Sequence, residues 1–226
     1  MSAKVSFGWR VPDFPIDGAP YRLFRDQIFQ NLDVFQGRLS SAWITDHFFP
    51  WEGSFDQRIP TPEGFTNIAY LAGRYPGLLF GSIVLSQGYR PPALLAKMTA
   101  TLQELTGGRI ILGLGAGWKE NEYRAYGYPF PSAGVRLDQL EEAVQVIRAM
   151  WTQDQPTFRG RYYTIEDAFC QPRPEPAPPI MIGGGGRKRT LRIAARYADW
   201  WNVPGAPPEE YADLLGVLRE HCAAVG

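Results

Sequence analysis

The chain has 226 residues, 45% of them hydrophobic, and its 23 Lys and Arg residues balance 23 Asp and Glu residues. This composition is typical of a globular protein and excludes a general electrostatic attraction to nucleic acid or to an anionic membrane. No apolar run resembles a signal peptide or could span a bilayer, and the isolated Cys170 and Cys222 form no disulfide framework, so we expect a cytoplasmic protein.

Apolar, strand-like runs alternate with amphipathic helical stretches along the chain, which predicts βα units around a parallel sheet. Strands are expected at residues 4–11, 41–48, 78–85, 109–114, 179–183 and 199–203. Helices are expected at residues 21–36, 63–75, 92–105, 135–151, 187–197 and 208–223. The fourth helix is the clearest, because its apolar residues recur at spacings of three and four: Leu137, Leu140, Val144, Ile147 and Trp151.

Residues 153–178 break this alternation. TFRGRYYTIEDAF predicts a small β-hairpin, and the Pro-rich QPRPEPAPP behind it cannot be helical. We interpret residues 155–178 as an insertion in a barrel, so residues 1–226 are expected to form one domain.

The fold expected is therefore an α/β barrel of the TIM (β/α)8 type with parallel strands. Six βα units can be recognised, whereas a closed barrel has eight and about 250 residues. The last residues, HCAAVG, stand where a further strand should follow. Either the barrel closes in an unusual way, or it is shortened at the C-terminus.

Candidate catalytic residues follow the second strand, in SAWITDHFFPW. Ligands of βα barrels bind where the carboxyl ends of the strands pass into loops, and Asp46 and His47 stand at such an end. Histidine gives or takes a proton near neutral pH, and a neighbouring carboxylate can orient it. The alternative is an Asp-His pair that caps a turn. Two histidines and two cysteines predict no metal site.

Two further strand ends carry unusual residues. In GSIVLSQ, the polar Ser82 inside an apolar strand indicates either a bulge that faces a ligand or a plain core strand. In LGLGAGWKENEY, glycines 113, 115 and 117 strip one strand face of side chains, either for the approach of a flat molecule or for tight packing. Trp118 stands where a dinucleotide-binding GxGxxG motif needs its last glycine, and Asn121 can hydrogen-bond a ligand just beyond the strand.

The run IMIGGGGRKRT predicts an anion site. Four glycines between a strand and a helix expose backbone N–H groups at a positive helix end, which suits a phosphate. Arg187, Lys188 and Arg189 add positive charge. The run lacks the GK[ST] of a P-loop, so hydrolysis of nucleoside triphosphates is not indicated.

In order along the chain, these stretches resemble the bacterial-luciferase-like monooxygenase superfamily, from the first strand to residue 226. GRIILGLGAGW followed at this distance by IGGGG is the specific part of the resemblance, whereas TDHF alone is not specific. Within the superfamily, GAGWKENEYRAYGYPFP is most similar to the branch assigned to the deazaflavin coenzyme F(420).

The resemblance implies a homodimer whose barrel holds a flavin or deazaflavin ring in its mouth. It places His47 at the ring with Asp46 beside it, Trp51 on the substrate side, and Ser82-Ile83 at the family's bulge, often a non-prolyl cis peptide. We expect Trp118 to pack the substrate pocket together with Trp51. The cofactor-binding residues that the resemblance implies are Ser82, Ile83, Gly115, Asn121, Gly183, Gly184, Gly185, Gly186 and Arg187. Relatives that oxidise a sugar phosphate place a catalytic glutamate where this chain has Trp118, which favours a more apolar substrate.

We therefore expect an oxidoreductase that uses F(420) for hydride transfer to or from a small, apolar organic substrate. One alternative is an FMN-dependent monooxygenase that uses reduced flavin and oxygen. Another is a non-catalytic, flavin-binding or degenerate barrel. A phosphosugar isomerase or aldolase would need a lysine or paired carboxylates at the strand ends, where this chain offers Asp46 and Lys119.

Overall fold

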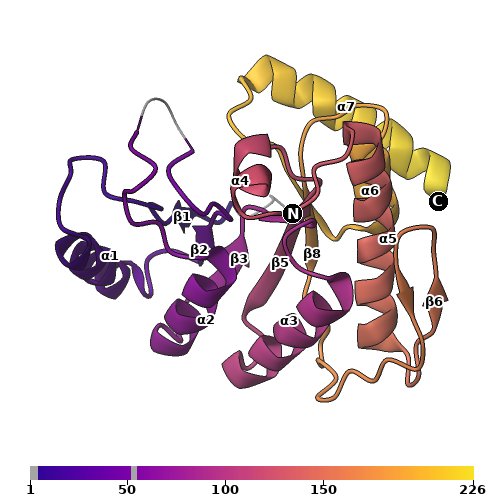
Figure 1. The fold of residues 1–226 in the computed structure, drawn as a ribbon, viewed down its shortest axis with the longest axis horizontal. Helices are drawn as coiled ribbons and strands as arrows, with labels where there is room; N and C mark the ends of the chain where they lie inside the picture. Colours follow the sequence, from indigo (N-terminus) through magenta and orange to yellow (C-terminus); the bar gives the residue numbers. More distant parts are fainter. Residues whose placement is uncertain (1–4, 52–54) are drawn as a thin grey trace.

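The computed structural model describes residues 5–51 and 55–226. Within them, seven parallel strands form one sheet in the order β1-β2-β3-β5-β8-β9, with β4 paired to β5 (Figure 1). The strands are β1 (Gly8–Arg10), β2 (Ser41–Ile44), β3 (Leu79–Ser82), β4 (Leu85–Ser86), β5 (Ile110–Gly115), β8 (Ile180–Gly183) and β9 (Trp200–Asn202). The prediction of a parallel α/β barrel is confirmed.

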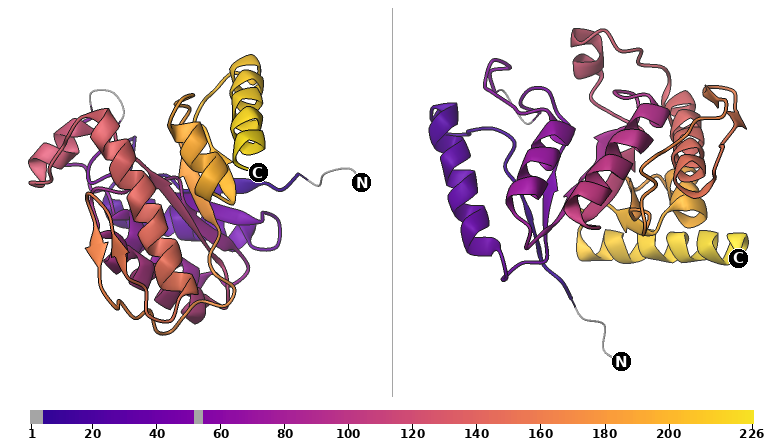
Figure 2. Two further views of the ribbon diagram at one scale, coloured as in Figure 1. Left: turned by 90° about the vertical axis from the view of Figure 1, so that its right-hand side faces the viewer. Right: turned by 90° about the horizontal axis from the view of Figure 1, so that it is seen from below.

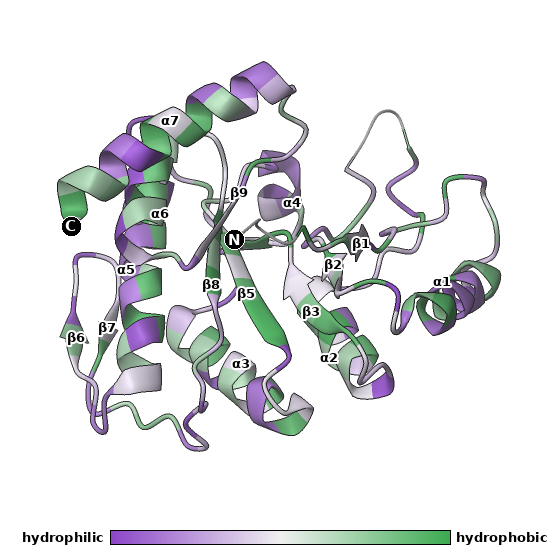
Figure 3. Ribbon diagram, turned by 180° about the vertical axis from the view of Figure 1, so that it is seen from behind, coloured by the Kyte–Doolittle hydropathy of each residue, from purple (hydrophilic) through white to green (hydrophobic). Residues whose placement is uncertain are grey.

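Most of the helices cover the convex face of the sheet, whereas the short helix after β5 lies at the carboxyl ends of the strands (Figures 1 and 2). They are α1 (Tyr21–Phe35), α2 (Gly64–Arg74), α3 (Pro92–Thr106), α4 (Glu120–Ala125), α5 (Ala133–Thr152), α6 (Thr190–Tyr197) and α7 (Pro208–Val225). Helices α2, α3 and α6 pack on β3, β5 and β8, whereas α5 packs on α3 and α6, and α7 lies across α6. In Figure 3 the central strands are the most hydrophobic part of the ribbon, which is where the buried core sits.

Local sequence signals explain where these helices begin and end. Pro92 occupies the first turn of α3, and Gly107 ends it with a φ of 66°, a conformation that glycine adopts without strain. The Ser132 side chain accepts the N–H of Val135 at the start of α5. Four of the five apolar residues predicted for the α5 stripe are buried: Leu140, Val144, Ile147 and Trp151.

The sheet curls into a half-barrel with β1 and β9 at its edges, and in the described ranges it does not close. Trp43 of β2 and Trp200 of β9 meet across the concave face with ring centroids 6.2 Å apart, although three strands separate β2 from β9 in the sheet. Gly8 and Gly81 flank Trp43 on the neighbouring strands, and a Cβ on either would overlap the indole ring. Because Gly8 and Gly81 have no side chains, the Trp43 ring fits inside the curled sheet.

The predicted insertion is confirmed as a hairpin of β6 (Phe158–Arg159) and β7 (Thr164–Ile165). The carboxylate of Glu142 on α5 fixes it, accepting the backbone N–H groups of Arg161, Tyr162 and Tyr163 at 2.8, 2.8 and 3.0 Å. Charge-assisted hydrogen bonds of this kind are stronger than neutral ones. They hold the hairpin against α5, and the Tyr163 hydroxyl adds a hydrogen bond at 2.9 Å to Gln87, the residue that follows β4.

Several sequence predictions differ from the structure in detail, and the strand expected at 41–48 ends at Ile44. The strand expected at 78–85 is divided into β3 and β4, and the one expected at 4–11 is shorter, with residue 4 outside the described residues. The helix expected at 187–197 begins at Thr190, because residues 187–189 form a turn. Helix α4 was not predicted, since its six residues are too few to show a period. No helix in the described ranges has the length and apolarity needed to cross a membrane.

Candidate active site

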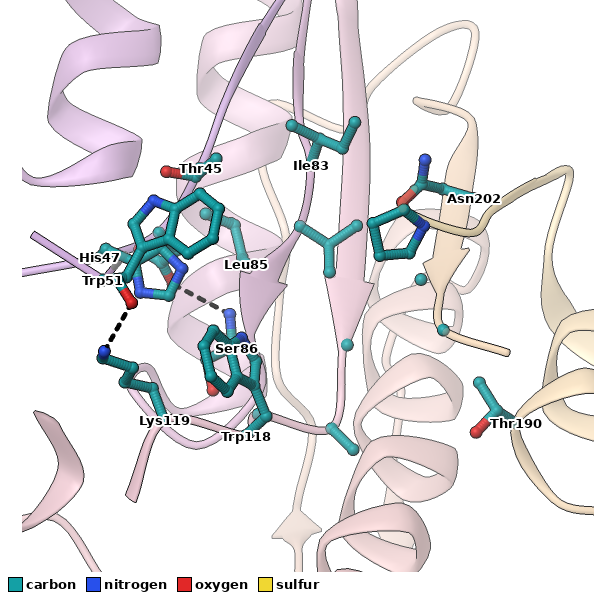
Figure 4. A pocket seen from close by; sticks show the side chains of 18 of the residues that line it. Thr45, His47, Trp51, Ile83, Leu85, Ser86, Trp118, Lys119, Thr190 and Asn202 are labelled. Atoms are coloured by element: carbon teal, nitrogen blue, oxygen red, sulfur yellow. Dashed lines mark hydrogen bonds between the residues drawn. The ribbon is translucent and has the colours of Figure 1, made fainter. Parts of the chain in front are cut away.

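A cavity of about 460 Å³ opens at the carboxyl ends of the parallel strands (Figure 4). Ten of the residues selected from the sequence line it: Asp46, His47, Trp51, Ile83, Gly115, Trp118, Gly183, Gly184, Gly185 and Gly186. His47, Trp51 and Trp118 lie at one end, whereas Asn202 and Thr190 lie at the other, with Ile83 and Leu85 between them. The pocket thus has an aromatic end and a glycine-rich end.

At the aromatic end, His47 is held by Glu122, a residue of α4. The His47 Nδ1 lies 2.9 Å from Glu122 Oε2 and 3.2 Å from Oε1. The Glu122 side chain is fully buried and also accepts the Phe48 backbone N–H at 3.0 Å and the Tyr89 hydroxyl at 3.0 Å. Burial, followed by the charge of Glu122, raises the pKa of Tyr89, so its hydroxyl stays protonated and donates.

Asp46 has a different partner from the one that the sequence suggested. Its carboxylate accepts two hydrogen bonds from Arg90, at 2.8 and 2.9 Å, and a third from the Ser86 backbone N–H at 2.9 Å. Arg90 also pairs with Glu63, whose carboxylate caps the start of α2. Burial opposes the charge on Arg90, but the hydrogen bonds and charges of Asp46 and Glu63 raise its pKa overall. The carboxylate that orients His47 is therefore Glu122 and not Asp46.

Two tryptophans enclose the His47 imidazole. Trp51 stacks on it with ring centroids 5.4 Å apart, and Trp118 meets it edge-on at 5.7 Å. The Trp51 indole N–H donates to Asp13 at 3.1 Å, and Lys119 donates to the Trp51 carbonyl at 2.9 Å, so the ring is fixed from both sides. The Trp118 side chain is 61% exposed at the rim of the pocket.

The floor of the pocket is the bulge between β3 and β4. A non-prolyl cis peptide joins Ile83 to Val84, one residue later than the Ser82-Ile83 position expected. The Val84 side chain occupies the space left by the glycines of β5 and β8, since a Cβ on Gly115 or Gly183 would lie 2.8 Å from its Cγ2. Of the two explanations for the alternating glycines 113, 115 and 117, close packing accounts for Gly115 and also for Gly113, where a Cβ would overlap the Ser82 carbonyl.

At the other end, the turn between β8 and α6 presents backbone amides. Gly184 donates its N–H to the Asn202 carbonyl at 2.8 Å, whereas in the part of the chain that the structure describes Gly185 and Gly186 donate theirs to no other residue. Thr190, the first residue of α6, adds its hydroxyl to the pocket. A Cβ on Gly186 would come within 2.6 Å of that hydroxyl, so glycine keeps it accessible.

Three of the predicted cofactor-binding residues do not line the pocket. Ser82 is buried beneath it, where its hydroxyl bonds the Gly113 carbonyl and N–H at 2.8 and 2.9 Å. Asn121 is on the exposed side of α4. Arg187 is half exposed and pairs with Asp213 of α7, so it ties α7 to the turn instead of facing the cavity.

Sequence reasoning missed several polar residues of the site, among them Glu122, Arg90, Tyr89, Thr190 and Asn202. Thr190 and Asn202 follow or end strands of the sheet, as the general rule for strand ends would have indicated. Glu122 carried no such signal, because its hydrogen-bond partners lie 33 to 75 residues away in the sequence.

Comparison with known proteins gives a consistent result. The family model described as luciferase-like monooxygenase matches residues 38–226. The chain is 36% identical over 191 residues to an F420-dependent glucose-6-phosphate dehydrogenase of Kineococcus radiotolerans, covering 83% of this chain and 55% of that protein. It is 35% identical over 136 residues to an FMNH(2)-dependent dimethylsulfone monooxygenase of Pseudomonas putida, covering 60% of this chain and 38% of that protein.

Among solved structures, the chain is similar to an F420-dependent secondary alcohol dehydrogenase in complex with an F420-acetone adduct. The TM-score is 0.86 at 25% sequence identity, and the match covers 99% of this chain and 66% of the other. The chain spans about half the length of the curated relatives that it matches.

Proposed function

The chain belongs to the luciferase-like monooxygenase family, and we propose that it acts as an oxidoreductase that binds the deazaflavin coenzyme F(420) in the pocket at the strand ends. The observation that carries the proposal is that the two ends of this pocket differ in chemistry. A histidine between two tryptophans stands at one end, and glycine amides with a threonine hydroxyl stand at the other. The F420-dependent relatives support the choice of cofactor.

The residues present fit such a cofactor. The apolar floor of Ile83, Val84 and Leu85 suits a flat ring system, and the N–H groups of Gly185 and Gly186, in the turn before α6, suit the phosphate of its side chain. The space beside Thr190 exists only because residue 186 has no Cβ. When bound, a deazaflavin supplies hydride-transfer chemistry.

The chain's own residues have three tasks in this proposal. His47 accepts or donates the proton that accompanies oxidation or reduction of the substrate. Trp51 and Trp118 pack against the substrate and exclude water from the imidazole. Trp118 places an apolar ring at the rim where the resemblance puts the catalytic glutamate of sugar-phosphate-oxidising relatives, which supports a small apolar organic substrate.

An FMN-dependent monooxygenase is the second candidate, favoured by the similarity to the FMNH(2)-dependent enzyme. Both cofactors carry a phosphate and a tricyclic ring, so the glycine turn suits either. Titration of the 226-residue chain with F(420) and with FMN, each followed by fluorescence, separates the two candidates. We expect tighter binding of F(420). Tighter binding of FMN would favour the monooxygenase, and binding of neither would support the non-catalytic alternative.

The role of the glycine turn is tested by replacing Thr190 with valine, which has the same shape and no hydroxyl. Losing one hydrogen bond to a charged group is expected to weaken cofactor affinity about 10- to 100-fold. Thr152→Val makes the same change on the exposed end of α5 and serves as the matched control. Equal affinity of the Thr190 and Thr152 variants would place the cofactor's anionic group elsewhere.

We further propose that two copies of the chain form a homodimer in the cytoplasm. Cys170 and Cys222 are both free thiols, which fits a reducing compartment. Sedimentation equilibrium is expected to give twice the chain mass of 25.4 kDa, and a mass equal to one chain would contradict the dimer.

A further inference from the structure

The surroundings of Glu122 restrict which hydrogen bonds its side chain can make. It is fully buried on α4, and its two oxygens accept hydrogen bonds from three residues on two segments of the chain: His47, Phe48 and Tyr89. None of these partners is a lysine or an arginine. The Phe48 backbone N–H can only donate, and the Tyr89 hydroxyl donates to a carboxylate, which has no hydrogen of its own to offer.

These partners determine which nitrogen of His47 carries the hydrogen. A carboxylate is an acceptor only, so the His47 Nδ1 at 2.9 Å must be the donor. In the neutral imidazole the hydrogen then resides on Nδ1, and Nε2 keeps its lone pair. Glu122 does not line the cavity, whereas His47 does, so the ring edge that Glu122 leaves free is the edge that faces the pocket.

We propose that Glu122 is a positioning residue that fixes His47 as the Nδ1–H tautomer and thereby makes Nε2 the proton acceptor at the pocket. The inference rests on the proposed function in one respect only, the use of His47 as the proton carrier. Asp46 cannot substitute for Glu122, because Arg90 and the Ser86 N–H engage its carboxylate.

The geometry makes a specific prediction for Glu122→Gln. The amide oxygen must occupy the Oε1 position, because only an acceptor can meet the Phe48 N–H there. The amide NH2 then occupies the Oε2 position and donates to Nδ1, while the Tyr89 hydroxyl turns to accept its second hydrogen. The hydrogen of the imidazole is displaced to Nε2, so an isosteric substitution is expected to switch the tautomer.

The tautomer is measured by NMR of the full chain labelled with ¹⁵N-histidine, at a pH where the imidazoles are neutral. The chain has only two histidines, and a His221→Ala sample assigns the two signals. The wild type is expected to show a protonated Nδ1 and an unprotonated Nε2 for His47, and Glu122→Gln the reverse. A wild-type His47 protonated on Nε2, or one tautomer in both proteins, would overturn the proposal.

Turnover supplies the second readout. Glu122→Gln is expected to lower kcat about 10²- to 10⁴-fold, as for a general base held in the wrong tautomer, with cofactor affinity unchanged. The matched control is Glu120→Gln on the same helix, where Glu120 is exposed and pairs with Arg124. A tautomer switch without loss of kcat would overturn the positioning role and leave the oxidoreductase function standing. An inactive wild type would refute the proposed function, while the NMR result would still decide the tautomer.

Discussion

Replacing Arg90 by methionine is expected to lower the free energy of unfolding by about 3–5 kcal/mol. The reason is the Asp46 carboxylate, which remains in place when Arg90 is removed. The Asp46 side chain is 1% exposed, and Arg90 supplies two of its three hydrogen bonds and its opposite charge. Removing one member of a buried ion pair leaves a charge without compensation, which costs more than the pair itself contributes. The measurement is the urea midpoint and slope of unfolding.

Two further variants test whether the loss of stability comes from the buried Asp46 charge. Arg124→Met breaks a pair whose two side chains are largely exposed, and little change is expected. Adding Asp46→Asn to Arg90→Met removes the stranded charge, so much of the lost stability should return. Equal unfolding midpoints for the Arg90 and Arg124 variants would contradict the prediction, and a double variant no more stable than Arg90→Met would show that the Asp46 charge is not the cause of the loss.

The fold could be predicted from sequence because its elements repeat one simple pattern. The central strands β2, β3, β5 and β8 are largely buried and read as short apolar runs, and most helices show their own period or their own punctuation, such as Pro92 and Gly107 in α3. The single domain of residues 1–226 stays a prediction. How the sheet curls was not accessible from periodicity, since it depends on Trp43 meeting Trp200 across the concave face.

The site was predictable where topology alone brings residues together. His47, Trp51, Trp118 and the glycines of the β8–α6 turn all follow strands, and parallel strands place their carboxyl ends at one edge. Asn121 was chosen one residue too early in a helix that the sequence did not reveal. Neighbours on a helix point about 100° apart, so Glu122 faces inward and Asn121 outward.

The alternating glycines show why composition alone cannot separate function from packing. An empty strand face suits either a ligand or a side chain of the protein. Here the Val84 side chain lies over Gly115, and a Cβ on Gly113 would overlap the Ser82 carbonyl, so these two glycines support the floor of the pocket and not the ligand directly. Only the path of the bulge between β3 and β4 decides this, and that path is set by contacts between distant segments.

Replacing His47 by alanine is expected to lower turnover about 10²- to 10⁴-fold with little change in cofactor affinity. The imidazole contacts Trp51 and Trp118 at the aromatic end, whereas the anionic group of the cofactor is proposed to bind the glycine turn at the other. The substitution is therefore expected to lower kcat and to leave the dissociation constant of the cofactor unchanged. Added imidazole should restore part of the activity by filling the vacated space beside Glu122. Unchanged turnover would remove His47 from the mechanism.

Combining the two substitutions tests whether His47 and Glu122 act as one unit. If Glu122 serves the reaction only by setting the His47 tautomer, Glu122→Gln should slow the wild type strongly and the His47→Ala protein hardly at all. Independent roles would instead multiply the two losses. His221→Ala, a change outside the cavity lining, controls for the loss of a histidine as such. The free energies of unfolding of the same variants, measured in urea, separate chemistry from packing. If the contact is purely structural, the two substitutions are non-additive in stability, and kcat falls only as far as the fraction of folded protein falls.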